Sequence, residues 1–154
     1  MPRKIRKCYY SKCRHGGQIN TETDEYVQDK NLYHADCYQE MKNLQLIRNL
    51  WIERISNTVS YSQLNKVLRS YLDRGISSDY LLFTLQYVIA NHMALRYPGG
   101  LQYYIDREEI KKQYQKTFKS NQRQMSNDIA AKSNVPKFAV KTKREGFASI
   151  IGDQ

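Results

Sequence analysis

Apolar residues recur every three or four positions in most of the chain between residues 37 and 118, which is the period of α-helices that bury one face. The pattern predicts a mainly α-helical core of about four helices. Their apolar residues are Met41, Leu44, Ile47, Trp51 and Ile55 in the first; Leu64, Val67, Leu68, Tyr71 and Leu72 in the second; Leu81, Leu82, Leu85, Val88, Ile89, Met93 and Leu95 in the third; and Ile110, Tyr114 and Phe118 in the fourth. The third group is apolar on most faces, so we expect its helix to be the central one.

Polar residues, proline and glycine mark the expected ends of these helices. The expected starts are Ser60 with Gln63, Ser78 with Asp79, and Asp106 with Glu109, of which the first and the last have the spacing of a capping box. Gly75 follows the last apolar residue of the second helix and is expected to end it. The run Pro98-Gly99-Gly100 is expected to end the third helix, and residues 101–105 are expected to form an extended or turn segment.

Upstream of the helices, residues 24–34 show the alternation of a short β-hairpin. Tyr26 and Val27 on one side, and Leu32 and Tyr33 on the other, flank a polar turn at Asp29-Lys30-Asn31. This predicted hairpin lies between two pairs of residues that are common metal ligands.

All three cysteines lie near the N-terminus, in the pattern Cys8-x4-Cys13-x20-His34-x2-Cys37. Three thiolates and one imidazole form a complete tetrahedral ligand set for Zn²⁺. His34 and Cys37 are three residues apart, so one helical turn presents both on the same face. We therefore predict one structural Zn²⁺, because four protein ligands leave no open coordination position. Two alternatives stay open at this point: unpaired thiols beside an unrelated histidine, and replacement of one ligand by His15.

A cysteine pair followed by a hairpin and a His-x-x-Cys at a helix start resembles LIM-type and related treble-clef zinc fingers. The resemblance implies that residues 1–40 form a small finger folded around its metal. The segments YLDRGISSDYLLFTLQY, YPGGLQYYID and EEIKKQY, within residues 61–116, resemble small, mostly uncharacterised phage proteins of Gram-positive hosts. This second resemblance implies an origin in a phage or mobile element and brings no activity with it.

The chain has a formal net charge of +10, and a basic excess of this size attracts polyanions. Nucleic acid is therefore the first partner that the charge suggests, and maintenance of solubility is the competing explanation. The predicted nucleic-acid contacts near the cysteine pair are Arg3, Lys4, Arg6, Lys7, Lys12 and Arg14. Together with Tyr9 and Tyr10 they are suited to hold phosphates or stack on an unpaired base. The alternative is a solvated terminus whose tyrosines pack over the metal site.

The apolar period stops near residue 121, and we expect residues 121–154 to form a flexible basic tail. Its predicted nucleic-acid contacts are Lys137, Lys141, Lys143 and Arg144. Phe147, Ile150 and Ile151 have the spacing of one helical face, which predicts a motif that docks into a partner's groove. The alternative is that these three residues pack against the protein's own core.

The expected organisation is thus a zinc finger at 1–40, a helical domain at 41–120 and the tail. The chain contains neither a Walker loop nor a G-x-S-x-G motif, and we expect no enzymatic activity. It also has no secretory signal and no apolar run near the ~18 residues of a membrane span, so we expect a cytoplasmic protein that does not bind membranes. The leading hypothesis is nucleic-acid binding, to DNA, in a regulatory or replication role. The alternative is an adaptor or inhibitor that binds a host polymerase, replication or defence complex.

Overall fold

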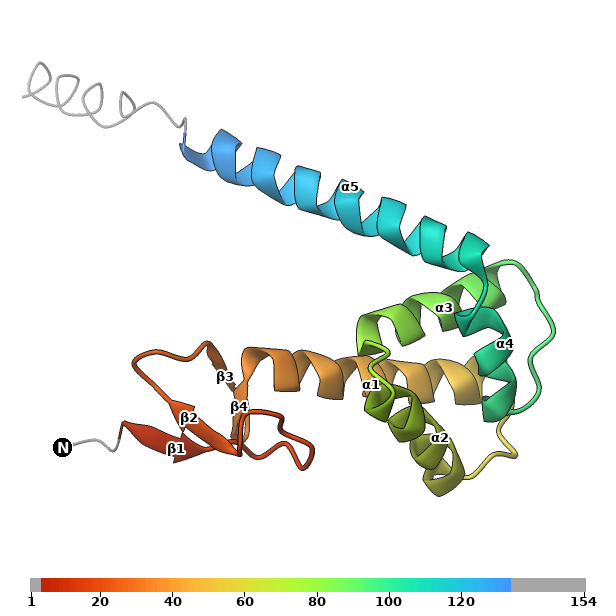
Figure 1. Cartoon of the computed structure of the whole chain (residues 1–154), viewed down its shortest axis with the longest axis horizontal. Helices are drawn as coiled ribbons and strands as arrows, with labels where there is room; N and C mark the ends of the chain where they lie inside the picture. The colour runs from red at the N-terminus through yellow and green to blue at the C-terminus, as the bar shows by residue number, and fades with distance from the viewer. Residues whose placement is uncertain (1–3, 134–154) are drawn as a thin grey trace, which may run out of the picture. The chain divides into compact units, whose positions relative to one another are not determined.

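A computed structural model describes residues 4–133 of the chain, and the side chains of residues 4–127. The described part is mainly helical, as the sequence predicted, and it contains two small antiparallel hairpins. The chain divides into two units, residues 1–114 and residues 115–154, and the boundary falls within the last helix. Figure 1 labels the elements in chain order.

Two separate two-stranded sheets form the N-terminal region. Strand β1 (Ile5–Lys7) pairs with β2 (Gln18–Asn20), and β3 (Tyr26–Gln28) pairs with β4 (Leu32–His34). The predicted hairpin at residues 24–34 is confirmed. The first hairpin was not predicted, because the loop of residues 8–17 separates its strands, whereas only residues 29–31 separate the strands of the second.

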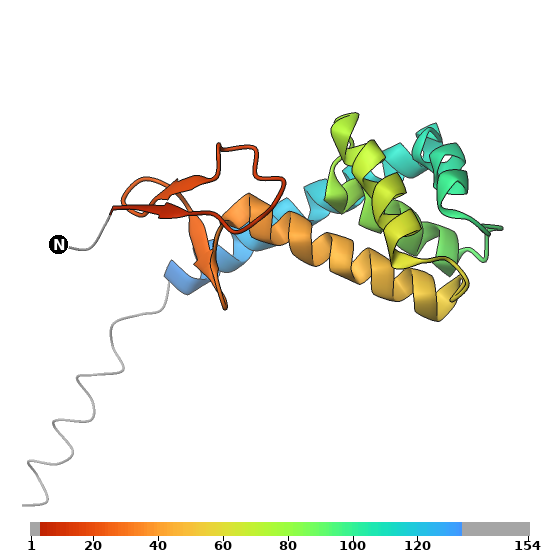
Figure 2. The same cartoon turned by 90° about the horizontal axis from the view of Figure 1, so that it is seen from below.

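Helix α1 (Ala35–Arg54) begins directly after β4 and connects the strands to the helical core. Its apolar period places Leu44, Ile47 and Trp51 in the interior. Figure 2 shows α1 beside α3, and the two helices are in contact. Asn43, which is buried on α1, donates hydrogen bonds to Ser78 Oγ (3.0 Å) and Asp79 Oδ1 (2.7 Å) at the start of α3. A polar contact therefore fixes α1 against α3 near the strands.

Helix α2 (Tyr61–Asp73) has the ends that the sequence predicted. The Ser60 hydroxyl accepts a hydrogen bond from the backbone N–H of Gln63 at 3.2 Å. At the other end Gly75 has φ +87°, its N–H donates to Leu72 O, and the N–H of Ile76 donates to Tyr71 O. This pair of bonds is a Schellman motif, in which the left-handed residue is most often glycine.

Helix α3 (Ser78–Ala90) is shorter than the sequence predicted. Ser77 caps its start by accepting a hydrogen bond from the N–H of Tyr80. The helix stops at Ala90 because the backbone turns sharply at His92, which has φ +51°. Met93 and Leu95, which were expected within the helix, therefore lie after its end. Both are partly buried and pack against buried core residues.

The prediction for residues 101–105 was wrong. Pro98–Gly100 form a 3₁₀ turn (η1), and Leu101–Ile105 form a short helix, α4, rather than an extended segment. Leu101, Tyr104 and Ile105 are its buried residues, at the i, i+3 and i+4 positions of one helical face. Burial of this face against α3 outweighs the strand preference of the aromatic residues.

Helix α5 (Glu108–Ser133) starts after Arg107, whose carbonyl accepts from the N–H of Lys111 at 3.2 Å. Asp106, the predicted cap, ends α4 instead. The helix also continues to Ser133, beyond the boundary at residue 120 expected for the helical domain. Within the described residues, no helix combines the length and the apolar character that are needed to cross a membrane.

Candidate metal centre

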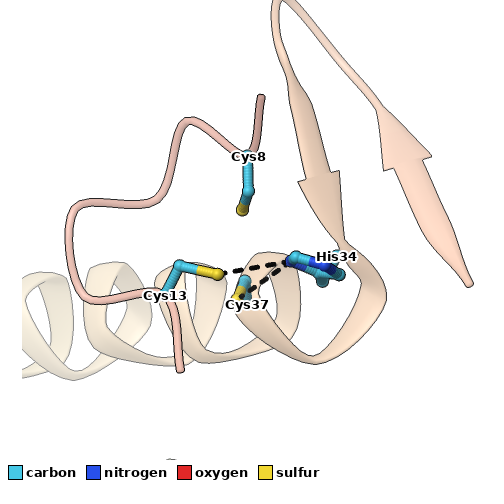
Figure 3. Close-up of side chains that lie close together, drawn as sticks. All are labelled: Cys8, Cys13, His34 and Cys37. Carbon is cyan, nitrogen blue, oxygen red and sulfur yellow. Dashed lines mark hydrogen bonds between the residues drawn. The ribbon is translucent and has the colours of Figure 1, made fainter. Parts of the chain in front are cut away.

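The loop between β1 and β2, strand β4 and helix α1 place the predicted ligands in one cluster (Figure 3). Cys8 directly follows β1, and Cys13 lies in the loop between β1 and β2. His34 is the last residue of β4, and Cys37 is in the first turn of α1. The N–H of Tyr9 donates to Leu32 O at 3.0 Å, which joins the first loop to the second hairpin. This backbone bond brings the two pairs of ligands together.

The distances between the ligand atoms match those around a tetrahedral metal ion. The three Sγ atoms and one imidazole nitrogen lie within 4.8 Å of one another. His34 Nδ1 is 3.4 Å from Cys13 Sγ and 3.9 Å from Cys37 Sγ. With Zn–S near 2.3 Å and Zn–N near 2.0 Å, a tetrahedral site separates sulfur from nitrogen by about 3.5 Å and sulfur from sulfur by about 3.8 Å. The four residues could therefore bind one metal ion with little rearrangement.

The cluster is shielded from solvent. Cys8, His34 and Cys37 are only 3 %, 4 % and 5 % exposed, and they pack with Ile19 and Leu32. These few apolar side chains form a core too small to stabilise the two hairpins alone. Binding of a metal ion would supply the folding free energy that this small core lacks.

The thiols have electrostatic reasons to accept a cation. Burial, together with the neighbouring Cys13 and Cys8 sulfurs, raises the pKa of Cys37. Burial opposes ionisation of Cys13 as well, but hydrogen bonds from the backbone of His15 and Gly17 outweigh it and lower the pKa of that thiol. A bound divalent cation deprotonates the thiols that coordinate it and neutralises the repulsion between the thiolates.

His34 also has an acidic neighbour that sequence reasoning missed. Its Nε2 atom is buried and makes no hydrogen bond to any residue between 4 and 127, and Asp24 Oδ2 lies 3.8 Å away. Asp24 is held in place by the N–H of Asn20 at 2.8 Å, a bond that also lowers the pKa of its carboxyl group. A carboxylate on the far side of a metal-binding imidazole orients the ring. Nothing in the spacing of Asp24 from the cysteines indicated this position.

His15 lies beside the cluster and is not one of its four residues, but it forms a second, largely exposed group of possible ligands with Asp36 and Cys37. It is exposed, its Nε2 is 2.6 Å from Asp36 Oδ2, and its ring centroid is 4.4 Å from that of His34. The hydrogen bond to Asp36 raises the pKa of His15, so the pair favours the charged imidazolium. The geometry favours the set Cys8, Cys13, His34 and Cys37 over one in which His15 replaces a ligand.

The predicted cations near the cysteine pair that the structure describes, Lys4, Arg6, Lys7, Lys12 and Arg14, are all exposed. Lys4 pairs with Glu22 at 2.9 Å, and Arg14 lies 3.7 Å from Glu40. The two tyrosines differ: Tyr9 is exposed, with Lys7 Nζ 5.7 Å from its ring centroid, whereas the Tyr10 hydroxyl donates to Glu40 at 2.6 Å. Only Tyr9 is therefore available to an outside partner.

The remaining predicted site residues lie outside the described part of the chain: Arg3, Lys137, Lys141, Lys143 and Arg144 among the cations, and Phe147, Ile150 and Ile151 in the docking motif. Comparisons with protein-family models, with curated proteins and with solved structures give no match to this chain. Its function has to be inferred from its own geometry and charge.

Proposed function

We propose that Cys8, Cys13, His34 and Cys37 bind one structural Zn²⁺ in a treble-clef-like finger, and that the protein binds DNA through the basic surface around it. The observation on which the proposal rests is the convergence of four soft and borderline donors, from the β1–β2 loop, β4 and α1, within 4.8 Å. Thiolate and imidazole ligands in a compact tetrahedral arrangement suit Zn²⁺ better than the hard cations Mg²⁺ and Ca²⁺.

The zinc would have a structural role. Four protein ligands fill its coordination sphere, so no position remains for a water molecule or a substrate. The function of the ion is then to hold the two hairpins and the first turn of α1 together, and to fix the exposed side chains that these elements present.

The exposed cations around the finger support nucleic acid as the partner. Arg6 and Lys7 lie on β1, and Lys12 and Arg14 lie in the loop that contains Cys13. Each cation that contacts a phosphate releases a counterion, which gives an affinity that falls steeply with salt. Tyr9, 56 % exposed beside Lys7, provides a ring on which a base can stack.

The proposal is tested with the full chain by metal analysis and by DNA binding measured as fluorescence anisotropy at several salt concentrations. The logarithm of the affinity should fall linearly with the logarithm of the salt concentration. Replacement of Arg6, Lys7, Lys12 and Arg14 by Gln should reduce the slope by up to about 3.6, because each lost phosphate contact removes about 0.9. Absence of binding at low salt, or a slope that the replacement leaves unchanged, would contradict it.

The second candidate is a non-enzymatic adaptor or inhibitor that binds a host protein complex. It is supported by large exposed tyrosines on the helical part, Tyr97 at 64 % and Tyr103 at 63 %, since tyrosine is enriched in protein interfaces. A pull-down from host lysate with and without nuclease separates the two candidates. A partner retained after nuclease treatment favours the adaptor, whereas a partner lost with the DNA favours the finger proposal.

A further inference from the structure

Three cations of α5 lie on one face of the helix. Lys116, Lys119 and Arg123 are spaced i, i+3 and i+7, and at 100° per residue they fall within about 60° of one another around the helix axis. All three side chains are exposed. They form a straight row about 10 Å long on the surface of the helix, which we call the α5 basic row.

The charge on this part of the helix is unbalanced. The sequence has no acidic residue between Glu109 and Asp128, so the carboxylates of the first turn stand more than one helical turn before the row. Like charges three and four residues apart repel one another and destabilise an isolated helix. A polyanion bound along the row would remove this repulsion.

Amide and hydroxyl side chains border the α5 basic row. Gln122, Ser126 and Asn127 line a shallow hollow together with Lys119 and Arg123. Arginine, glutamine and asparagine are the side chains that pair with the edges of guanine and adenine in the major groove. The surface thus combines groups for phosphate contact with groups for base contact.

We propose that α5 binds in the major groove of duplex DNA through the α5 basic row. The inference rests on the proposed function and adds to it the element that enters the groove. The major groove of B-form DNA admits an α-helix, whereas the major groove of A-form RNA is too deep and narrow for side chains to read. On the face opposite the row, Phe118 and Met125 are the large apolar residues between positions 115 and 127. Two such residues are too few for stable insertion into a bilayer.

The test compares the full-length protein with a triple variant, Lys116→Gln, Lys119→Gln and Arg123→Gln. Glutamine is uncharged and has nearly the helix propensity of lysine and arginine, and circular dichroism checks the helix content. The matched control, Lys30→Gln, Lys66→Gln and Arg96→Gln, removes the same number of exposed lysines and arginines elsewhere. A third variant, Lys116→Arg, Lys119→Arg and Arg123→Lys, keeps the charge of the row.

Duplex DNA binding is measured by anisotropy between about 50 and 200 mM salt, and binding to anionic phosphatidylserine vesicles is measured in parallel. For the triple variant we expect a salt slope smaller by about 2.7 and an affinity at least about tenfold lower at the lower salt concentration, because three phosphate contacts are lost. The control and the charge-preserving variant should keep the wild-type slope.

Equal slopes for the triple variant and its control would overturn the inference, while DNA binding that still depends on Arg6, Lys7, Lys12 and Arg14 would leave the proposed function intact. A wild-type protein that binds no duplex DNA overturns both. Binding to anionic vesicles that exceeds binding to DNA, and that the triple variant abolishes, would also overturn the inference and assign the row to a membrane surface.

Discussion

The Nδ1 atom of His34 lies 3.4 Å from the Sγ atom of Cys13, although the two residues are 21 positions apart in the sequence. The first belongs to the second hairpin and the second to the loop of the first hairpin. Two hairpins that share no sheet therefore meet at one pair of ligand atoms. A metal ion at this position would be the principal link between them.

Replacement of Cys13 by Ser should release the metal, because a neutral hydroxyl is a poor substitute for a thiolate. The strands should then unfold while the buried helical core around Leu81 and Leu85 stays folded. Metal analysis and the amide spectrum of labelled protein measure both effects. His15→Gln is the control, and it should keep one zinc per chain. Purified wild-type protein with no metal and three freely titratable thiols would refute this prediction.

Replacement of Asn43 by Ala should destabilise the helical core by about 1–3 kcal/mol, because the buried Ser78 hydroxyl and the exposed Asp79 carboxylate both lose the Asn43 amide as a hydrogen-bond donor. Denaturant unfolding followed by circular dichroism measures the change. Asn49→Ala, at an exposed position of the same helix, is the matched control and should change stability by less than about 0.5 kcal/mol. Equal effects of the two replacements would show that the hydrogen bonds of Asn43 to α3 contribute nothing to the free energy of unfolding.

Gly75→Ala should cost about 1 kcal/mol or more, because the left-handed φ of +87° is strained for any residue with a Cβ atom. No atom lies within 4 Å of the position that the added methyl group would occupy, so the cost is conformational rather than steric. Gly99→Ala is the control: φ at Gly99 is not in the left-handed region, and the nearest side-chain atoms are 3.6 Å away. A thermal melt in which Gly99→Ala is the more damaging change would contradict the assignment of the Schellman motif.

Stability should fall above about pH 10, the ordinary pKa of tyrosine. Burial raises the pKa of both Tyr71 and Tyr80, and their hydroxyls donate to the carbonyls of Pro98 and Ile105. The folded protein keeps these phenols neutral while the unfolded chain ionises them. Their contribution is therefore fully present below pH 10 and is lost as the pH rises through the folded-state values.

Unfolding free energies measured between about pH 8 and pH 11.5 test this dependence. The double variant Tyr71→Phe and Tyr80→Phe should have a shallower decline, since it has no phenol to ionise at these positions. Tyr61→Phe, at an exposed position, is the control and should leave the wild-type pH dependence unchanged. A decline equally steep in the double variant would show that other groups cause it.

The pattern of apolar and polar residues was sufficient to predict α1, α2 and the hairpin at residues 24–34. The buried side chains of the two helices repeat with the helical period, and in β4 the buried Leu32 and His34 alternate with the half-buried Tyr33. The pattern failed for α4, where only one turn of helix exists and Tyr103 and Tyr104 suggested a strand. It failed again at the end of α3, where His92 takes the left-handed position of a Schellman motif: its N–H donates to Ile89 O, and the N–H of Met93 donates to Val88 O. Glycine usually fills this position, so a histidine there gave no sign of a helix end.

The candidate metal centre could also be predicted only in part from the sequence. The cluster of Cys8, Cys13, His34 and Cys37 could be predicted because cysteine and histidine are rare in this chain and these four residues lie in two close pairs. The position of Asp24 beside His34 could not be predicted, because it follows from the turn after β2, where the Asp24 carboxylate accepts a hydrogen bond from the N–H of Asn20. The different environments of Tyr9 and Tyr10 also depended on the fold, because only the structure places Glu40 of α1 within reach of Tyr10.

Helix α1 has His34 as its N-cap residue, and the His34 side chain makes no capping hydrogen bond. Cys37 lies in its first turn, Asn43 is held further along by α3, and Trp51 is buried near its end. Loss of a metal ion would therefore remove the anchor at one end only, and fraying should stop near Asn43. Zinc occupancy would then control the length of a single helix, and amide hydrogen exchange along residues 35–43 would measure it directly.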